Sequence, residues 1–280
     1  MRAAFRHPLF RNPAVLAGGG ILLLLVLMAI LAPLLSHADP LAIAPRFRLK
    51  PPSPQFPMGS DKLGRDVLTR SFYGARVSLL VSICVATIAI STGLVIGLVA
   101  GYIRRLDGVI MRVMDGLMAI PGILLAIALV SLSGSSLYTV IIAIVVPEIP
   151  RVARLVRSVV LSIREEPYVE AAVGLGTSTY RILTQHILPN TIAPLIVQGT
   201  YICASAILTE AILSFLGAGL SSEIPTWGNI IADGRDVFQR APWIILFPGA
   251  FLAATILAVN ILGDGLRDTL DPRMKKRLGA

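Results

Sequence analysis

The sequence predicts an all-α polytopic membrane protein with six transmembrane helices. Hydrophobic residues make up 55% of the 280 residues and charged residues only 15%, and the mean hydropathy is +0.79. This composition is typical of proteins with several membrane spans and not of soluble domains. A second observation is that no charged residue lies between Asp115 and Glu148. That interval is too long for one span, and the turn-forming segment 131–136 divides it into two.

Six apolar stretches are long enough to cross a bilayer, which takes about 20 residues of helix. We expect spans at residues 14–35, 77–103, 109–130, 137–155, 191–216 and 241–262. The first stretch is longer than the apolar part of a signal peptide and no clear small-residue cleavage site follows it, so we expect a retained helix.

The spans divide the chain into two parts. Residues 1–76 are expected to hold an N-terminal cytoplasmic segment, the first helix and an external loop, and residues 77–280 the main transmembrane domain. Within the external loop, Leu68, Phe72 and Val77 are spaced like one face of an interfacial helix that leads into the second span.

The placement of Lys and Arg predicts that both termini are cytoplasmic. One short loop contains Arg104 and Arg105, whereas the 131–136 turn has no charge. The external loop at residues 37–76 is also basic, but the rule is weaker for long loops. The net charge of +9 does not indicate a nucleic-acid partner, because no basic patch is interleaved with aromatic residues. The expected surroundings of the spans are membrane lipid.

The stretch between the fourth and fifth spans, YVEAAVGLGTSTYRILTQHILPN, has a distinctive spacing. It contains Glu170-Ala171-Ala172, then Gly176 four residues later, and it ends on Leu188-Pro189. We place this loop at residues 158–190.

Helix formers predict a helix at residues 165–174 of this loop. Pro167 suits its first turn, and Gly174 and Gly176 can end it in a left-handed conformation. A second short helix is predicted at residues 178–187. Leu188-Pro189 is expected to stop this second helix before the fifth span.

The spacing of this loop resembles the one by which permeases of ATP-binding-cassette (ABC) importers dock onto their ATPase subunits. In that family the pattern is Glu-Ala-Ala, three residues, Gly, nine residues, Ile, one residue, Leu-Pro; here His186 stands at the Ile position. The resemblance implies that Glu170 enters a cleft of the ATPase and that Gly176 permits a close fit. The docking residues that it implies are Glu170, Ala171, Ala172, Gly174, Gly176, Leu188 and Pro189.

Further segments resemble the dipeptide, oligopeptide and nickel branch of these permeases. They are residues 59–80, 210–220, 225–231 and 247–273. The chain resembles the permease of that branch with a short N-terminal segment and one extra helix before a five-helix, type I core. The resemblance implies a bacterial or archaeal inner-membrane protein that works with a homologous second permease, two cytoplasmic ATPases and an external substrate-binding protein.

Charged residues inside the spans are candidates for function, because they are expensive to bury in lipid. Glu210 near the outer end of the fifth span is a candidate for the pathway or gate, or for a structural anchor beneath the outer loop. Glu148 is expected to pair with Arg151, and Asp115 with Arg112, within their own helices.

Three glycines, Gly93, Gly97 and Gly101, follow one another at four-residue spacing in the second span. Residues four apart lie on one face of a helix, and small residues let helices approach closely in lipid. The sequence therefore predicts a packing seam along this face.

We predict that the chain is not an enzyme and holds no cofactor. It has no Gly-x4-Gly-Lys-Ser/Thr phosphate loop, so ATP and Mg²⁺ are expected in the partner ATPases. His7, His37 and His186 are scattered, and Cys84 and Cys203 lie in apolar runs, so no metal site is indicated.

Short peptides are the expected cargo. Nickel or another small solute is the alternative within the same importer type. A self-sufficient channel or secondary transporter is the alternative from another class, and it would need acids near the bilayer midplane and inverted repeats.

Overall fold

The computed structural model describes residues 12–36 and 38–270, which form helices joined by irregular segments. No strand occurs in these residues, where the one β-bridge joins Ser60 and Asp66. The basic residues of both chain ends, His7 and His37 lie outside the described residues. The helices are α1 Pro13–Ile30, α2 Ala32–Leu35, η3 Pro45–Phe47, α3 Val67–Tyr102, α4 Arg104–Met118, α5 Gly122–Ser133, α6 Leu137–Ile163, α7 Pro167–Gly174, α8 Thr179–Arg181, η4 Ile182–Ile187, α9 Leu188–Phe215, α10 Trp227–Gly234, η5 Arg235–Val237 and α11 Trp243–Leu270.

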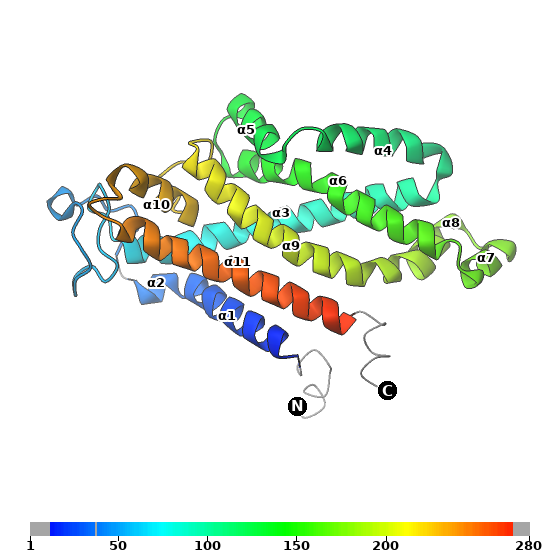
Figure 1. Cartoon of the computed structure of the whole chain (residues 1–280), viewed down its shortest axis with the longest axis horizontal. Helices are drawn as coiled ribbons and strands as arrows, with labels where there is room; N and C mark the ends of the chain where they lie inside the picture. The colour runs from blue at the N-terminus through cyan, green and yellow to red at the C-terminus, as the bar shows by residue number, and fades with distance from the viewer. Residues whose placement is uncertain (1–11, 37, 271–280) are drawn as a thin grey trace.

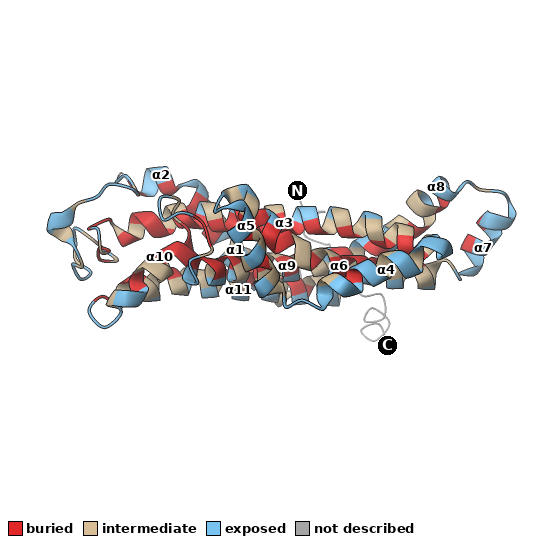
Figure 2. Cartoon of the chain, turned by 90° about the horizontal axis from the view of Figure 1, so that it is seen from above, coloured by how far each residue is buried: buried red, intermediate tan, exposed pale blue. Residues whose placement is uncertain are grey.

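The long helices α3, α6, α9 and α11 run side by side along the molecule, with α1 against α11 (Figure 1). The helices α7 and α8 lie at one end, whereas α2, α10 and the irregular segment before α3 lie at the other. We call the second end the cap end. Figure 2 shows that buried residues follow the inner faces of the long helices, whereas α7, α8 and the loops of the cap end are largely exposed.

Four continuous helical segments of the described residues are long and apolar enough to cross a membrane: α1, α3, the run from α8 through α9, and α11. The bent pair of α4 and α5 makes a fifth if it is counted as one broken span. The six predicted spans are therefore not all confirmed. The missing one is α6, which is 27 residues long but carries Glu148, Arg151 and Arg154 on successive turns.

The predicted third span at residues 109–130 is wrong as a straight helix. The helix is interrupted between Met118 and Gly122, and the axes of α4 and α5 differ by 84°. Pro121 explains the break, because its ring disfavours helical backbone at the preceding residue and removes an N–H donor. Of the residues of α4, only Met114 is buried.

The predicted interfacial helix before the second span is instead the beginning of α3. Asp66 caps this helix, and its carboxylate accepts a hydrogen bond of 3.0 Å from the Thr69 N–H. Phe72 packs edge-on against Phe251 of α11, with ring centroids 6.3 Å apart. Residues 67–76 thus belong to the helical bundle, and the expected domain boundary after residue 76 lies inside α3.

The predicted glycine seam is confirmed, and its partner is α6. A Cβ on Gly93 would lie 2.5 Å from the Cβ of Val152, and one on Gly97 would lie 2.6 Å from that of Val156. Gly101 stands in the same relation to Val160, at 2.6 Å. The three valines are fully buried. A glycine ladder on α3 therefore receives a valine ladder on α6, and no side chain larger than hydrogen fits on the α3 side.

Ion pairs attach α4 to α6. The guanidinium of Arg157 donates two hydrogen bonds to the carboxylate of Asp107, and Arg154 pairs with Asp115. The predicted pair of Asp115 with Arg112 is therefore wrong, because a neighbouring helix supplies the cation. The predicted pair within α6 is confirmed, with Arg151 Nη1 3.1 Å from Glu148 Oε1.

We expect Gly97→Ala to destabilise the protein, because the added methyl group overlaps Val156 and the carbonyl oxygen of Ala153. Overpacking of a tight contact costs about 1–3 kcal/mol. The measurement is the melting temperature in detergent, followed by size-exclusion chromatography. Gly249→Ala is the control, because no atom lies within 4 Å of the added carbon in α11. Equal melting temperatures for the two variants would contradict the seam.

Candidate functional site

The loop between α6 and α9 forms the predicted first helix, α7. Pro167 occupies its first turn after Glu166, and the helix ends at Gly174. Gly176 adopts the left-handed conformation with φ of +76°, whereas Gly174 is helical. The N–H of Thr177 donates to the Ala172 carbonyl across this turn, at 3.1 Å. The helix and its glycine terminator are confirmed, with Gly176 alone in the left-handed role.

One face of α7 is buried and holds the loop against the bundle. Val169 is 1% exposed and belongs to the same apolar core as Ile182 and Ile187 of η4. Ala172 is also buried, at 9% exposure. These contacts hold α7 against η4, next to the start of α9.

The opposite face of α7 is open and mostly apolar. Glu170, Ala171 and Val173 of α7 are exposed. In the same loop, Leu175 directly after α7 is 87% exposed and Tyr180 of α8 is 78% exposed. A loop that exposes an acidic side chain and several large apolar residues has the composition of a surface that binds another protein.

The predicted stop at Leu188-Pro189 is wrong. The segment 182–187 is a π-helix that continues directly into α9, and the Leu188 N–H donates to the Leu183 carbonyl. Pro189 would clash with the carbonyl four residues earlier in a regular α-helix. The wider π turn removes this clash, so the proline begins α9 in place of ending the helix before it. Leu188 and Pro189 consequently belong to the first turn of α9, where Leu188 is half-buried and Pro189 is exposed.

The residue that departs from the family pattern, His186, contacts Tyr168 of α7. Their ring centroids are 6.0 Å apart, and the Asn190 side chain donates to the His186 carbonyl oxygen at 2.7 Å. The neighbouring Ile187 takes the buried position, with 0% exposure. The apolar anchor that the pattern places at residue 186 is thus supplied one residue later.

Glu210 lies in a buried polar cluster near the cap end, 1% exposed. Its Oε1 accepts hydrogen bonds from the hydroxyls of Ser214, at 2.8 Å, and Thr226, at 2.9 Å. Its Oε2 has no hydrogen-bond partner among the described residues, and the backbone of Gly228 lies beside it. The carboxylate therefore links α9 to Thr226, the N-cap residue of α10. This arrangement fits the structural anchor that was one of the two expectations for Glu210.

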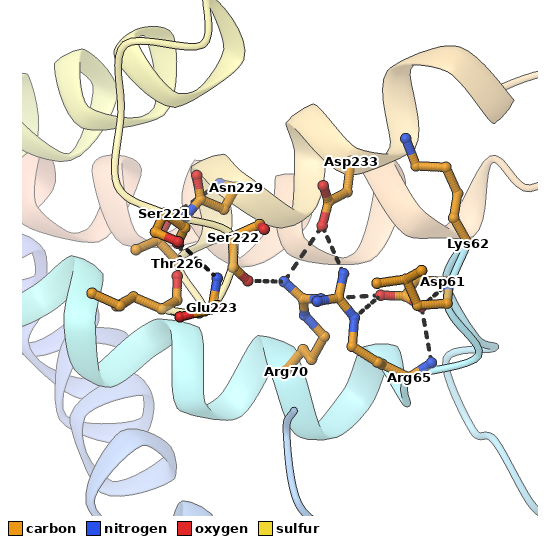
Figure 3. A network of polar contacts seen from close by, with 12 residues as sticks. Asp61, Lys62, Arg65, Arg70, Ser221, Ser222, Glu223, Thr226, Asn229 and Asp233 are labelled. Carbon is orange, nitrogen blue, oxygen red and sulfur yellow. Dashed lines mark hydrogen bonds and ion pairs between the residues drawn. The ribbon is translucent and has the colours of Figure 1, made fainter. Parts of the chain in front are cut away.

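A second polar cluster at the cap end joins Asp61, Arg65, Arg70 and Asp233, and we call it the cap network (Figure 3). Asp61 Oδ2 lies 2.5 Å from Arg65 Nε and 3.0 Å from Arg70 Nη1. Asp233 Oδ2 lies 2.9 Å from Arg65 Nη2 and 3.5 Å from Arg70 Nη2. Burial raises the pKa of Asp233, whereas Arg65 opposes this shift.

Sequence reasoning missed the cap network. The signal was present in the run from Asp61 to Arg70, which alternates acids and arginines directly before an apolar helix. The partner Asp233 lies 168 residues from Arg65, so only the fold brings the two together. At the margin of the network, Lys62 pairs with the exposed Asp236 at 3.4 Å and lowers the pKa of its carboxyl.

Two family profiles match the chain. Residues 93–276 match the "Binding-protein-dependent transport system inner membrane component" family, and residues 2–52 match the "N-terminal TM domain of oligopeptide transport permease C". The first match begins inside α3 and includes α4 to α11 with the loop between α6 and α9, and the second includes α1, α2 and η3.

The chain is also similar to curated proteins over nearly its whole length. It is 57% identical to a probable peptide ABC transporter permease protein of Sinorhizobium fredii, covering 99% of this chain and 93% of the relative. It is 45% identical to the dipeptide transport system permease protein of Alkalihalophilus pseudofirmus, covering 98% and 90%. It is 37% identical to the oligopeptide transport system permease protein of Bacillus subtilis, covering 95% and 87%.

We expect Glu210→Ala to destabilise the protein by about 1–3 kcal/mol, because it leaves two buried hydroxyls without their acceptor. Glu210→Gln keeps an acceptor oxygen in the same place and should retain most of the stability. Melting temperatures of the two variants in detergent make the comparison. Equal losses in both variants would show that the negative charge, and not the acceptor, is required.

Proposed function

Because the chain belongs to the family of binding-protein-dependent transport system inner membrane components, we propose that it is a permease subunit of an ABC importer for short peptides. The observation that carries this proposal is the similarity over nearly the whole chain to permeases named for peptide, dipeptide and oligopeptide transport. The chain supplies transmembrane helices and no catalytic machinery. Its role is to form the transmembrane path with a homologous second permease.

The exposed face of α7 is the proposed docking surface for a cytoplasmic ATPase. It presents Glu170 and Val173, the same loop exposes Leu175, and Gly176 leaves the backbone open to a partner. The second permease would supply an equivalent surface for the second ATPase. The chain has no phosphate-binding loop of its own, so ATP and Mg²⁺ would act only in those subunits.

This assignment orients the protein in the membrane. The end with α7 and α8 would be cytoplasmic, as would both termini, and the cap end would face the external binding protein that delivers the peptide. Closure of the ATPases on ATP would pull on α7, which follows α6 after the short turn 164–166 and packs on η4. Both α6 and α9 would therefore move with the docking surface.

We infer short peptides, and not nickel, as the cargo, because the relatives are named as peptide permeases. We expect vesicles that contain the complete complex, its binding protein and internal ATP to accumulate a labelled dipeptide and tripeptide mixture. Unlabelled peptide should compete with this uptake, and a nickel salt should not. Accumulation of nickel without peptide would overturn the cargo assignment.

Gly176→Asp should release the ATPase that docks on this chain. The added carboxylate lies at the docking loop, where no described residue occupies the space. The measurement is mass spectrometry of the proteins retained with the tagged chain after mild-detergent purification from its native membrane. Wild type should retain a second permease and two ATPases, and the variant should retain the second permease with no more than the one ATPase that docks on that permease. A well-folded wild-type chain recovered without partners would overturn the proposal.

Any side chain at the left-handed Gly176 strains the turn, so Gly176→Asp could act by distorting the loop. A second pair of variants tests the docking contact without this strain. Glu170→Ala and Glu165→Ala each remove one exposed glutamate from the same loop. Only the first lies on the docking face, so only Glu170→Ala should weaken ATPase retention. Equal retention in both variants would exclude Glu170 as a docking residue.

A further inference from the structure

The short helix α10 lies at the cap end and is packed on three sides by other helices. A Cβ on Gly228 would lie 2.6 Å from Cα of Ala211 in α9, and one on Gly234 would lie 2.7 Å from the side chain of Ile245 in α11. On the third side, a Cβ on Gly74 of α3 would lie 3.2 Å from the backbone of Thr226. The helix thus has no free space in which to shift by itself.

Buried hydrogen bonds reinforce this packing at the first turn of α10. Trp227 is fully buried, and its indole N–H donates to the Ser71 carbonyl at 3.0 Å. Its backbone N–H donates to the Ser78 hydroxyl at 3.3 Å. Thr226 caps the helix by accepting from the Asn229 N–H, and it donates to Glu210. The start of α10 is therefore bonded to both α3 and α9.

The cap network holds the other end of α10 by charge. Arg65 and Arg70 are 7% and 0% exposed, so their charges are stable there only if carboxylates face them. Asp61 and Arg65 lie in the irregular segment before α3, Arg70 lies in α3, and Asp233 comes from α10 (Figure 3). If α10 moved away, two buried guanidinium groups would share one carboxylate. The network consequently favours a single position of α10.

We propose that Arg65, Arg70 and Asp233 are positioning residues for transport, which keep α10 and the outer ends of α3, α9 and α11 together as one rigid body throughout the cycle. This inference rests on the proposed function and assigns the cap end a fixed role within it. It also means that α10 is not an independent gate.

The rigid body fixes the place of Glu210, because Thr226 at the start of α10 donates directly to its carboxylate. Conformational change is then left to elements that the structure holds less tightly. The bend between α4 and α5 is one, since α4 has a single buried residue and is attached to α6 by partly exposed ion pairs.

Hydrogen exchange of the α10 amides tests the network in the purified complex, with a matched pair of variants. Asp233→Asn removes the buried carboxylate, whereas Asp236→Asn removes an exposed one directly after the same helix. We expect amides 227–234 to exchange at least about 10-fold faster in Asp233→Asn, and at the wild-type rate in Asp236→Asn. Asp233→Glu, which keeps the carboxylate, should restore most of the protection. Equal exchange in Asp233→Asn and Asp236→Asn would overturn the proposal.

A transport readout distinguishes positioning from a purely structural role. Asp233→Asn should retain its ATPases and its ATP hydrolysis but lose peptide uptake, so the ratio of uptake to hydrolysis should fall. An unchanged ratio would overturn the positioning role. Failure of the proposed function would look different, because wild type itself would then take up no peptide, while the exchange experiment would still report on α10.

Cross-linking tests whether α10 moves during transport. Lys62→Cys and Asp236→Cys place thiols on two residues whose side chains pair in the wild type, in a chain whose Cys84 and Cys203 are replaced by alanine. A short bismaleimide that joins these thiols should leave peptide uptake unchanged. A monofunctional maleimide controls for blocked docking of the binding protein. Loss of uptake with the cross-linker alone would show that α10 separates from the outer segment, and would overturn the proposal.

Discussion

The close contact of α3 with α6 is the constraint on which the rest of the structure depends. Helices in lipid gain little from hiding apolar surface, so they associate through close packing. Glycines at residues 93, 97 and 101 provide that closeness, and valines on α6 fill the groove. Because only the turn 164–166 separates α6 from α7, this seam also sets where the proposed docking loop stands relative to α3.

The two ends of the bundle use different physical means for different tasks. At the start of α9, apolar residues such as Val169 and Ile187 anchor one face of α7, and the other face stays exposed. At the cap end, charges and hydrogen bonds between Arg65, Arg70 and Asp233 hold α10 in place. An exposed surface suits a partner that binds and exerts force, whereas a buried network suits a part that must keep its shape.

Much of the fold and of the proposed docking site followed from local patterns. The glycine spacing, the helix that Pro167 begins, the left-handed Gly176 and the pair of Glu148 with Arg151 depend on residues within a few positions of one another. One prediction failed because a neighbouring helix competes: Asp115 pairs with an arginine of α6. Another failed for a local reason, because the π turn at residues 182–187 lets the helix continue into α9 where Leu188-Pro189 was expected to stop it.

By itself, the sequence determined that the chain is a helical membrane protein, where its main apolar helices lie and which exposed loop carries the docking pattern. These properties depend on composition and on short spacings along one helix, which need no partner from elsewhere in the chain. Only the tertiary structure decided that valines of α6 fill the glycine groove, that Glu210 bonds to the cap of α10, and that Asp233 faces two arginines. Each of these contacts joins residues of different elements. Burial makes the two polar contacts necessary, because a buried charge or hydroxyl must find a partner wherever the fold supplies one.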